Sequence, residues 1–184
     1  MNPIETLTGE HRLIERMLDA LLAWSTGMVR RNGDERSELA NFVTFVQEYV
    51  DPVHHGKEED ILFATMAEHG FPKDQGPVAV MMHEHDECRR LIQTLAARTR
   101  QSSAWSEAER NEIARAAHGY ADLLRNHIVK EDQILYPISE ARLPNDAKAR
   151  IANGFERFEK EKAPPAERAR LVSLAEAFIA RHAP

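Results

Sequence analysis

Cysteine is almost absent from this chain of 184 residues, in which Cys88 stands alone. A single cysteine excludes an internal disulfide and thiolate-rich sites such as zinc fingers or iron–sulfur clusters, and it is typical of a protein from the reducing cytoplasm. Apolar runs long enough to span a membrane are also lacking, as are the basic and apolar regions of a secretory signal. We therefore expect a cytoplasmic protein that does not enter a membrane.

A basic excess is lacking too. Lys and Arg number 24 against 30 Asp and Glu, for a formal net charge of −6. Without a stripe of Lys or Arg to neutralise phosphates, nucleic acid is not an expected partner. The composition does not indicate an oligomeric state.

The alternation with a period of two that marks β-strands is absent as well, whereas apolar residues recur at intervals of three to four almost throughout. This pattern predicts an all-α protein. The expected helices run from a cap at Asn2 with Pro3 in the first position to Asn32-Gly33, from Asp34 to Gly70 with a kink at Pro52, from near Pro77 to the polar stretch 100–103, from a capping box at Ser106 and Glu109 to just before Pro137, and after Pro144 and Pro165.

A cluster of His, Lys and acidic residues occurs twice. Residues 54–63, of sequence HHGKEEDILF, recur seventy-three residues later as residues 127–136, HIVKEDQILY. In each copy a His and a Glu are four residues apart, which places them on one face of a helix. Glu10-His11 and Glu84-His85 form a second repeated pair. The repeated order predicts two helical hairpins folded around one shared site.

Two of the repeated acidic residues, Glu58 and Glu131, occupy stripes that are otherwise apolar. The apolar residues in phase with them are Val50, Ile61, Leu124 and Ile134, and the imidazoles in the same layer are His11, His54, His85 and His127. An ionised carboxylate buried without a partner costs several kcal/mol. No Lys or Arg is in phase, and neutral imidazoles cannot balance two carboxylates. One or two metal ions can, so the pattern predicts a metal site.

Imidazole and carboxylate ligands suit iron, manganese or zinc better than calcium, magnesium or copper(I). Carboxylates that can bridge favour two ions over one, and helix-bundle cores do build dinuclear sites from inward Glu and His. Neighbouring residues have other expected roles. His83 should face away from the site, about 200° round the helix from His85. Tyr120 should belong to the core, with the lining of an entry channel as the alternative. Glu59 is expected in solvent, with a role in orienting an imidazole as the alternative.

These motifs resemble the hemerythrin-like, or HHE cation-binding, proteins over about residues 1–140. The resemblance rests on residues 9–11, 54–63, 82–85 and 127–137, in the order of the family. It implies an up-down-up-down four-helix bundle that holds a non-haem di-iron centre, bridged by the two Glu. By matching position, the ligands would be His11, His54, Glu58, His85, His127 and Glu131. Residues 141–184 would form a C-terminal helical extension packed on the same domain.

The chain departs from the oxygen-carrying members at Met81, where their third helix has the first His of a His-x-x-x-His pair. One iron therefore lacks an imidazole. Water, His55, an extra carboxylate or a nearby Tyr could fill the position. The resemblance implies a protein that binds or senses oxygen, nitric oxide or redox state. The alternative is an enzyme that decomposes hydrogen peroxide or oxidises ferrous iron, which the gap at Met81 favours.

Overall fold

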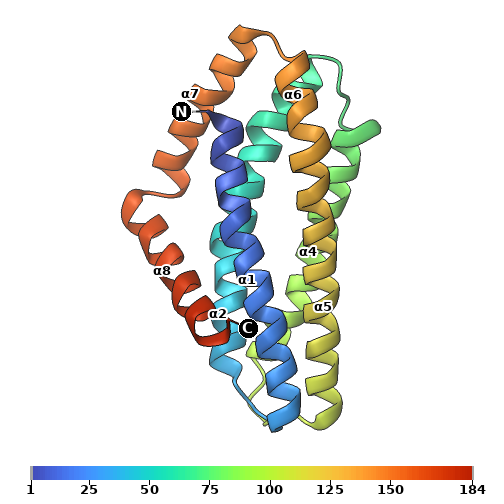
Figure 1. The fold of residues 1–184 in the computed structure, drawn as a ribbon, viewed down its shortest axis with the longest axis vertical. Coiled ribbons are helices and arrows are strands. Elements are labelled where there is room, and N and C mark those ends of the chain that lie inside the picture. Colours follow the sequence, from blue (N-terminus) through green and yellow to red (C-terminus); the bar gives the residue numbers. More distant parts are fainter. Residues whose placement is uncertain (1, 184) are drawn as a thin grey trace.

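The structure is a computed structural model that describes residues 2–183, and within this range the chain forms helices and no strand. The elements are α1 (Pro3–Arg31), α2 (Arg36–Phe45), η1 (Val46–His55), η2 (Glu58–Leu62), α3 (Phe63–Glu68), α4 (Gly76–Thr99), α5 (Glu107–Lys130), η3 (Glu131–Leu135), α6 (Tyr136–Arg142), α7 (Asn145–Lys162) and α8 (Pro165–His182). Four long helical segments run up and down side by side, which confirms the predicted bundle (Figure 1). Each η element is a stretch of π-helix that joins α-helices into one continuous segment.

The helix ends confirm the local signals of the sequence. The Asn2 side chain accepts a hydrogen bond from the Ile4 amide, and Asn32 closes α1 in the left-handed conformation with φ of 52°. Ser106 and Glu109 form the predicted capping box at the start of α5. These ends rest on side chains only a few residues away, so they can be read from a short window of sequence.

The π-helical stretches change which side chains face inward. An i→i+5 turn contains one residue more than an α-turn and shifts the phase of the residues after it. Ile134, predicted to be buried, is instead 51% exposed, and Leu135 is buried in its place. Ile61 is likewise only partly buried, while Leu62 is 1% exposed. The strict 3.6-residue period used for the prediction was wrong after each Glu of the repeat.

Two prolines lie inside continuous helical segments. Pro52 is part of η1, so the irregularity predicted there takes the form of a π-helical stretch. Pro137 does not end the fourth segment as predicted, because the chain remains helical to Arg142. Pro137 follows directly on η3 and stands in the first turn of α6.

The apolar core is divided into two clusters with a polar layer between them. Along α1, Leu7 belongs to one cluster and Ile14 to the other, and the buried His11 lies between them. The bundle thus holds its polar layer in the middle, with apolar packing on both sides.

The C-terminal helices α7 and α8 follow one another along the side of the bundle, with a bend at residues 163–164 between them (Figure 1). Phe178 of α8 packs in the core cluster that contains Phe42 of α2, with ring centroids 6.2 Å apart. Gly154 of α7 lies so close to η2 that an added Cβ would stand 2.9 Å from a methyl group of Ile61. The division of the chain at residue 140 stays a prediction.

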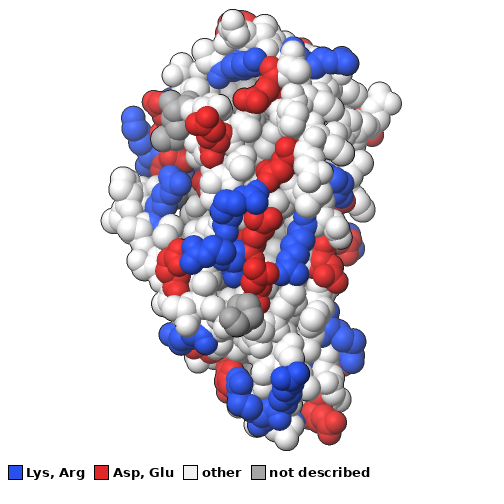
Figure 2. All heavy atoms as spheres, in the orientation of Figure 1, with Lys and Arg blue, Asp and Glu red and all other residues white. Residues whose placement is uncertain are grey.

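Charged side chains on the surface are mixed. Acidic and basic groups lie interspersed down the middle of the face in Figure 2. Ion pairs cross between helices, such as Arg16 with Glu176 and Arg125 with Asp19. Within residues 2–183, none of the helices combines the length and the apolar character that a membrane crossing would need.

Candidate metal centre

The six ligands predicted from the sequence lie together in the polar layer. They are His11 of α1, His54 of η1, Glu58 of η2, His85 of α4, His127 of α5 and Glu131 of η3. None is more than 1% exposed. His83 is on the surface, as predicted. The structure therefore brings all six side chains together; metal binding by them stays a prediction.

The donor atoms form two groups that share Glu58. One group contains His11, His54, Glu58 and Glu131, and the other contains His55, Glu58, His85 and His127. Within each group the donor atoms lie within 4.8 Å of one another. In the second group, the Nε2 atoms of His85 and His127 are 3.0 Å apart. Two adjacent positions therefore exist at which several donors could converge on one ion.

Each carboxylate lies between imidazoles from the two halves of the bundle. The Glu131 Oε2 atom is 3.3 Å from His11 Nε2 and 3.2 Å from His127 Nε2. The Glu58 Oε2 atom is 3.8 Å from His54 Nε2 and 3.5 Å from His85 Nε2. This is the arrangement that two carboxylates bridging a pair of ions would need.

Several polar atoms of the cluster are buried without a hydrogen bond to any residue within the described range 2–183. They are Oε2 of Glu58, both carboxylate oxygens of Glu131 and both ring nitrogens of His55. The contacts of Glu58 Oε2, Glu131 Oε2 and His55 Nδ1 at 3.2–3.8 Å are ion-pair contacts without hydrogen-bond geometry. Buried polar groups without partners are costly and uncommon in native proteins. A cation held by these atoms would satisfy them, and carboxylate and imidazole donors suit iron, manganese or zinc. The residues present therefore fit a metal centre.

A ring of outer carboxylates orients the imidazoles. The Nδ1 atoms lie 2.8 Å from Asp132 for His11, 2.9 Å from Glu10 for His54, 2.6 Å from Glu59 for His85 and 2.9 Å from Glu84 for His127. A carboxylate that accepts Nδ1–H leaves Nε2 free to bind a metal and fixes the orientation of the ring. The expectation that Glu59 is in solvent is replaced by its alternative, because Glu59 orients His85.

The outer carboxylates follow the sequence repeat. Glu10 and Glu84 each bind the His of their own copy, and Asp132 and Glu59 each bind the His that begins the other copy. Cations complete the arrangement: Lys57 pairs with Glu10, Lys130 with Glu84, Arg12 with Asp132 and Arg89 with Glu59. The repeated Glu-His pairs are visible in the sequence, but the contact that each Glu makes was not predicted. Their recurrence was the available signal.

Burial and neighbouring charges shift the pKa values in the cluster. Burial acts to lower the pKa of His11 and of His127, but nearby carboxylates outweigh it and raise both values to about 9. Burial, reinforced by the charge of Glu131, raises the pKa of Glu58 well above its usual range. Burial opposes ionisation of Glu131 as well, yet His127 and His11 hold the pKa of this carboxyl well below its usual range. Protons thus offset the charge when no metal is bound, and metal binding would displace them.

Tyr136 is a further residue of this centre, and its role was not predicted from the sequence. Its hydroxyl donates to Glu58 Oε1 at 2.5 Å, and its ring stacks on His11 with centroids 5.6 Å apart. Phe63, the equivalent residue of the first copy, stacks on His85 at 5.9 Å. Both aromatic residues follow a π-helical stretch, whose shift in phase turns them toward the site.

Met81 stands where a further imidazole ligand was expected, so another side chain beside His85 would have to take its place. Met81 is buried in an apolar cluster. His55 stacks on His85 with ring centroids 3.8 Å apart, and its Nδ1 is 3.5 Å from Asp51. A π-helical turn is wider than an α-turn, and within η1 both His54 and His55 are buried. Of the alternatives for the gap, the structure brings two into the cluster: His55 lies beside His85, whereas Tyr136 lies beside His11 and Glu58. Tyr120 lies in the core, as predicted.

The chain belongs to the hemerythrin HHE cation binding domain family, whose pattern matches residues 2–139. The iron-sulfur cluster repair protein YtfE of Escherichia coli O157:H7 is similar, with 27% identity over 132 residues that cover 69% of this chain and 60% of that protein. An uncharacterised protein of Mycobacterium tuberculosis is 24% identical over 136 residues, covering 72% of this chain and 51% of that protein. This chain thus spans about half to three fifths of these relatives. No solved structure matches it.

Proposed function

We propose that the polar layer holds two iron ions in a carboxylate-bridged non-haem centre. The observation that supports this most is the position of Glu58 and Glu131, each buried between imidazoles from both halves of the bundle. Membership in a cation-binding family supports a metal, and the name of the E. coli relative, an iron-sulfur cluster repair protein, supports iron. Manganese and zinc are the competing metals.

The proposed ligands are His11, His54, Glu58, His85, His127 and Glu131, with His55 as a seventh. Bound iron would supply a Lewis acid that can change oxidation state and take up small ligands. The chain's own residues hold the ligands in place: the outer carboxylates orient the imidazoles, and the Tyr136 hydroxyl holds Glu58. The apolar clusters on either side of the layer keep bulk water away from these donors.

We further propose that the centre binds or senses oxygen, nitric oxide or redox state in the cytoplasm, with such small molecules as its partners. The burial of every proposed ligand supports this, because only small molecules could reach the layer. An enzyme that decomposes hydrogen peroxide or oxidises ferrous iron is the second candidate. Tyr136 favours it, because its buried hydroxyl stands beside Glu58 and could supply or receive a proton.

The test loads the purified full chain with iron and titrates it with nitric oxide while the visible spectrum is recorded. We expect a saturable spectral change in the wild type and in His83→Ala, and a weaker or lost change in Glu131→Ala, which lacks a proposed bridging ligand. A wild-type spectrum that nitric oxide leaves unchanged would contradict the binding function. Steady oxygen evolution from peroxide that Tyr136→Phe abolishes would favour the enzyme instead.

A further inference from the structure

The C-terminal helices α7 and α8 contact the segment that bears the first copy of the repeated motif. Gly56 lies directly between His55 and Lys57, and a Cβ at this position would stand 2.7 Å from the ring of Phe158 in α7. The aromatic ring of Phe155, also in α7, lies 5.6 Å from the Lys57 Nζ atom. Glycine at position 56 thus permits α7 to lie close against the metal-binding segment, outside the range that matches the family.

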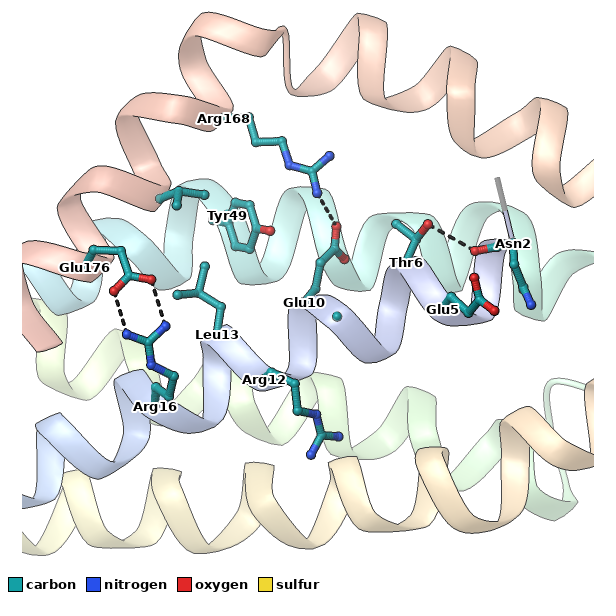
Figure 3. A pocket seen from close by; sticks show the side chains of 12 residues that line it. Asn2, Glu5, Thr6, Glu10, Arg12, Leu13, Arg16, Tyr49, Arg168 and Glu176 are labelled. Carbon is teal, nitrogen blue, oxygen red and sulfur yellow. Dashed lines mark hydrogen bonds and ion pairs between the residues drawn. The ribbon is translucent and has the colours of Figure 1, made fainter.

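Side chains of α7 and α8 act on Glu10, the carboxylate that orients His54. Glu159 of α7 accepts a hydrogen bond from Lys57 Nζ at 3.0 Å, and Lys57 also donates to Glu10. Arg168 of α8 lies 3.5 Å from Glu10 and 3.2 Å from Glu159. Figure 3 shows the Arg168 guanidinium directed at the Glu10 carboxylate, across a cavity of about 580 Å³ between α1 and α8. Glu10 therefore has Arg168 of α8 and Lys57 as partners on one side and His54 on the other.

The other half of the bundle has no such cover among the described residues. Lys130 is equivalent to Lys57 and pairs with Glu84, which orients His127. The Lys130 side chain is 35% exposed, whereas that of Lys57 is 0% exposed. Val129, equivalent to Gly56, is 46% exposed. The C-terminal helices α7 and α8 thus make the two halves of a repeated site unequal.

We propose that Arg168 and Glu159 are positioning residues for His54. Arg168 contacts Glu10 directly, and Glu159 acts on Glu10 through Lys57 and Arg168. Because Glu10 holds the His54 imidazole, the C-terminal helices control how firmly one half of the centre retains its metal. The proposal rests on the proposed function for its metal. The coupling of α7 and α8 to His54 through Glu10 does not require the metal and concerns the metal-free protein as well. The half that contains His127 should be independent of α7 and α8.

The test compares Arg168→Ala and Glu159→Gln with Arg170→Ala in the full chain. Arg170 is also on α8, but it is half exposed and pairs with Glu48 and Glu167. In metal-free protein, NMR would follow solvent exchange of the ring N–H protons of His54 and His127. In iron-loaded protein, a chelator would remove the metal while absorbance records the rate.

We expect faster exchange at His54 but not at His127 in the two test variants, with Arg168→Lys closer to wild type. Release of iron should be about threefold faster or more, which is less than the roughly 10–100-fold effect typical of direct partners of a ligand. Arg170→Ala should behave as wild type. Unchanged exchange at His54, or equal acceleration at both His, would overturn the coupling. A wild type that binds no iron would refute the proposed function, while the NMR comparison would still decide the coupling.

Discussion

Replacing Lys57 by methionine is expected to destabilise the protein much more than replacing Lys130 by methionine, although the two lysines are equivalent in the repeat. Methionine keeps most of the side-chain volume, so the substitution mainly removes charge and hydrogen bonds. The Lys57 side chain is 0% exposed and the Glu10 side chain is 2% exposed. The Lys57→Met variant therefore leaves a buried carboxylate without its main cation.

The size of the effect follows from burial. Removing one partner of a buried ion pair typically costs about 3–5 kcal/mol. We expect the lower end, about 3 kcal/mol, because Arg168 remains 3.5 Å from Glu10. The Lys130 pair is partly exposed, and such surface pairs contribute about 0–1 kcal/mol. In a protein of this size, 1 kcal/mol shifts the melting temperature by about 2–4 °C. The expected losses are about 6–12 °C for Lys57→Met and at most about 4 °C for Lys130→Met.

The assay is thermal unfolding of the metal-free protein followed by circular dichroism at one pH and ionic strength. Metal-free protein is used so that changes in metal affinity do not enter the melting temperature. A Lys57→Met variant that melts within 2 °C or so of Lys130→Met would refute the reasoning, because the buried and the exposed pair would then contribute equally.

Three further predictions concern the ligands, the metal and the packing of α7. Glu131→Ala should lose dinuclear metal binding while His83→Ala keeps it, which elemental analysis checks; metal lost only from the His83 variant would reverse the assignment of faces. Metal should stabilise the folded protein by about 4 kcal/mol when free metal exceeds its Kd a thousandfold, and the melting temperature should rise accordingly. Equal melting temperatures with and without metal would contradict a buried site. Gly154→Ala should destabilise by about 1–3 kcal/mol through overpacking against Ile61. Gly119→Ala should stabilise by up to about 1 kcal/mol, because its added Cβ meets no other described residue within 4 Å apart from its neighbours and the adjacent backbone of its own helix. Denaturant unfolding that shows both variants shifted alike would contradict the close contact at Gly154.

The sequence predicts those parts of the fold that local chemistry determines. The cap at Asn2, the left-handed Asn32 and the capping box at Ser106 each depend on residues within one helical turn. The inward position of Glu58 and Glu131 was predictable for the same reason, because each stands one turn after a buried His.

The remaining features depend on irregular turns or on distant contacts. The prediction of Ile134 as buried was wrong because η3 shifts the helical phase, and no residue type announces a π-helical turn. The hydrogen bond between His11 and Asp132 joins residues 121 positions apart, so only the packed bundle reveals it. Lys57 is out of phase with the carboxylates in an α-helix, yet it is fully buried, because α7 covers it with Phe155 and Glu159.

The central claim is that two ions share the carboxylates Glu58 and Glu131. The most direct measurement is the metal content of protein produced with ample iron, determined by elemental analysis against an accurate protein concentration. The structure predicts two irons per chain, a number that excess iron does not raise. One iron per chain, or none, would contradict the account.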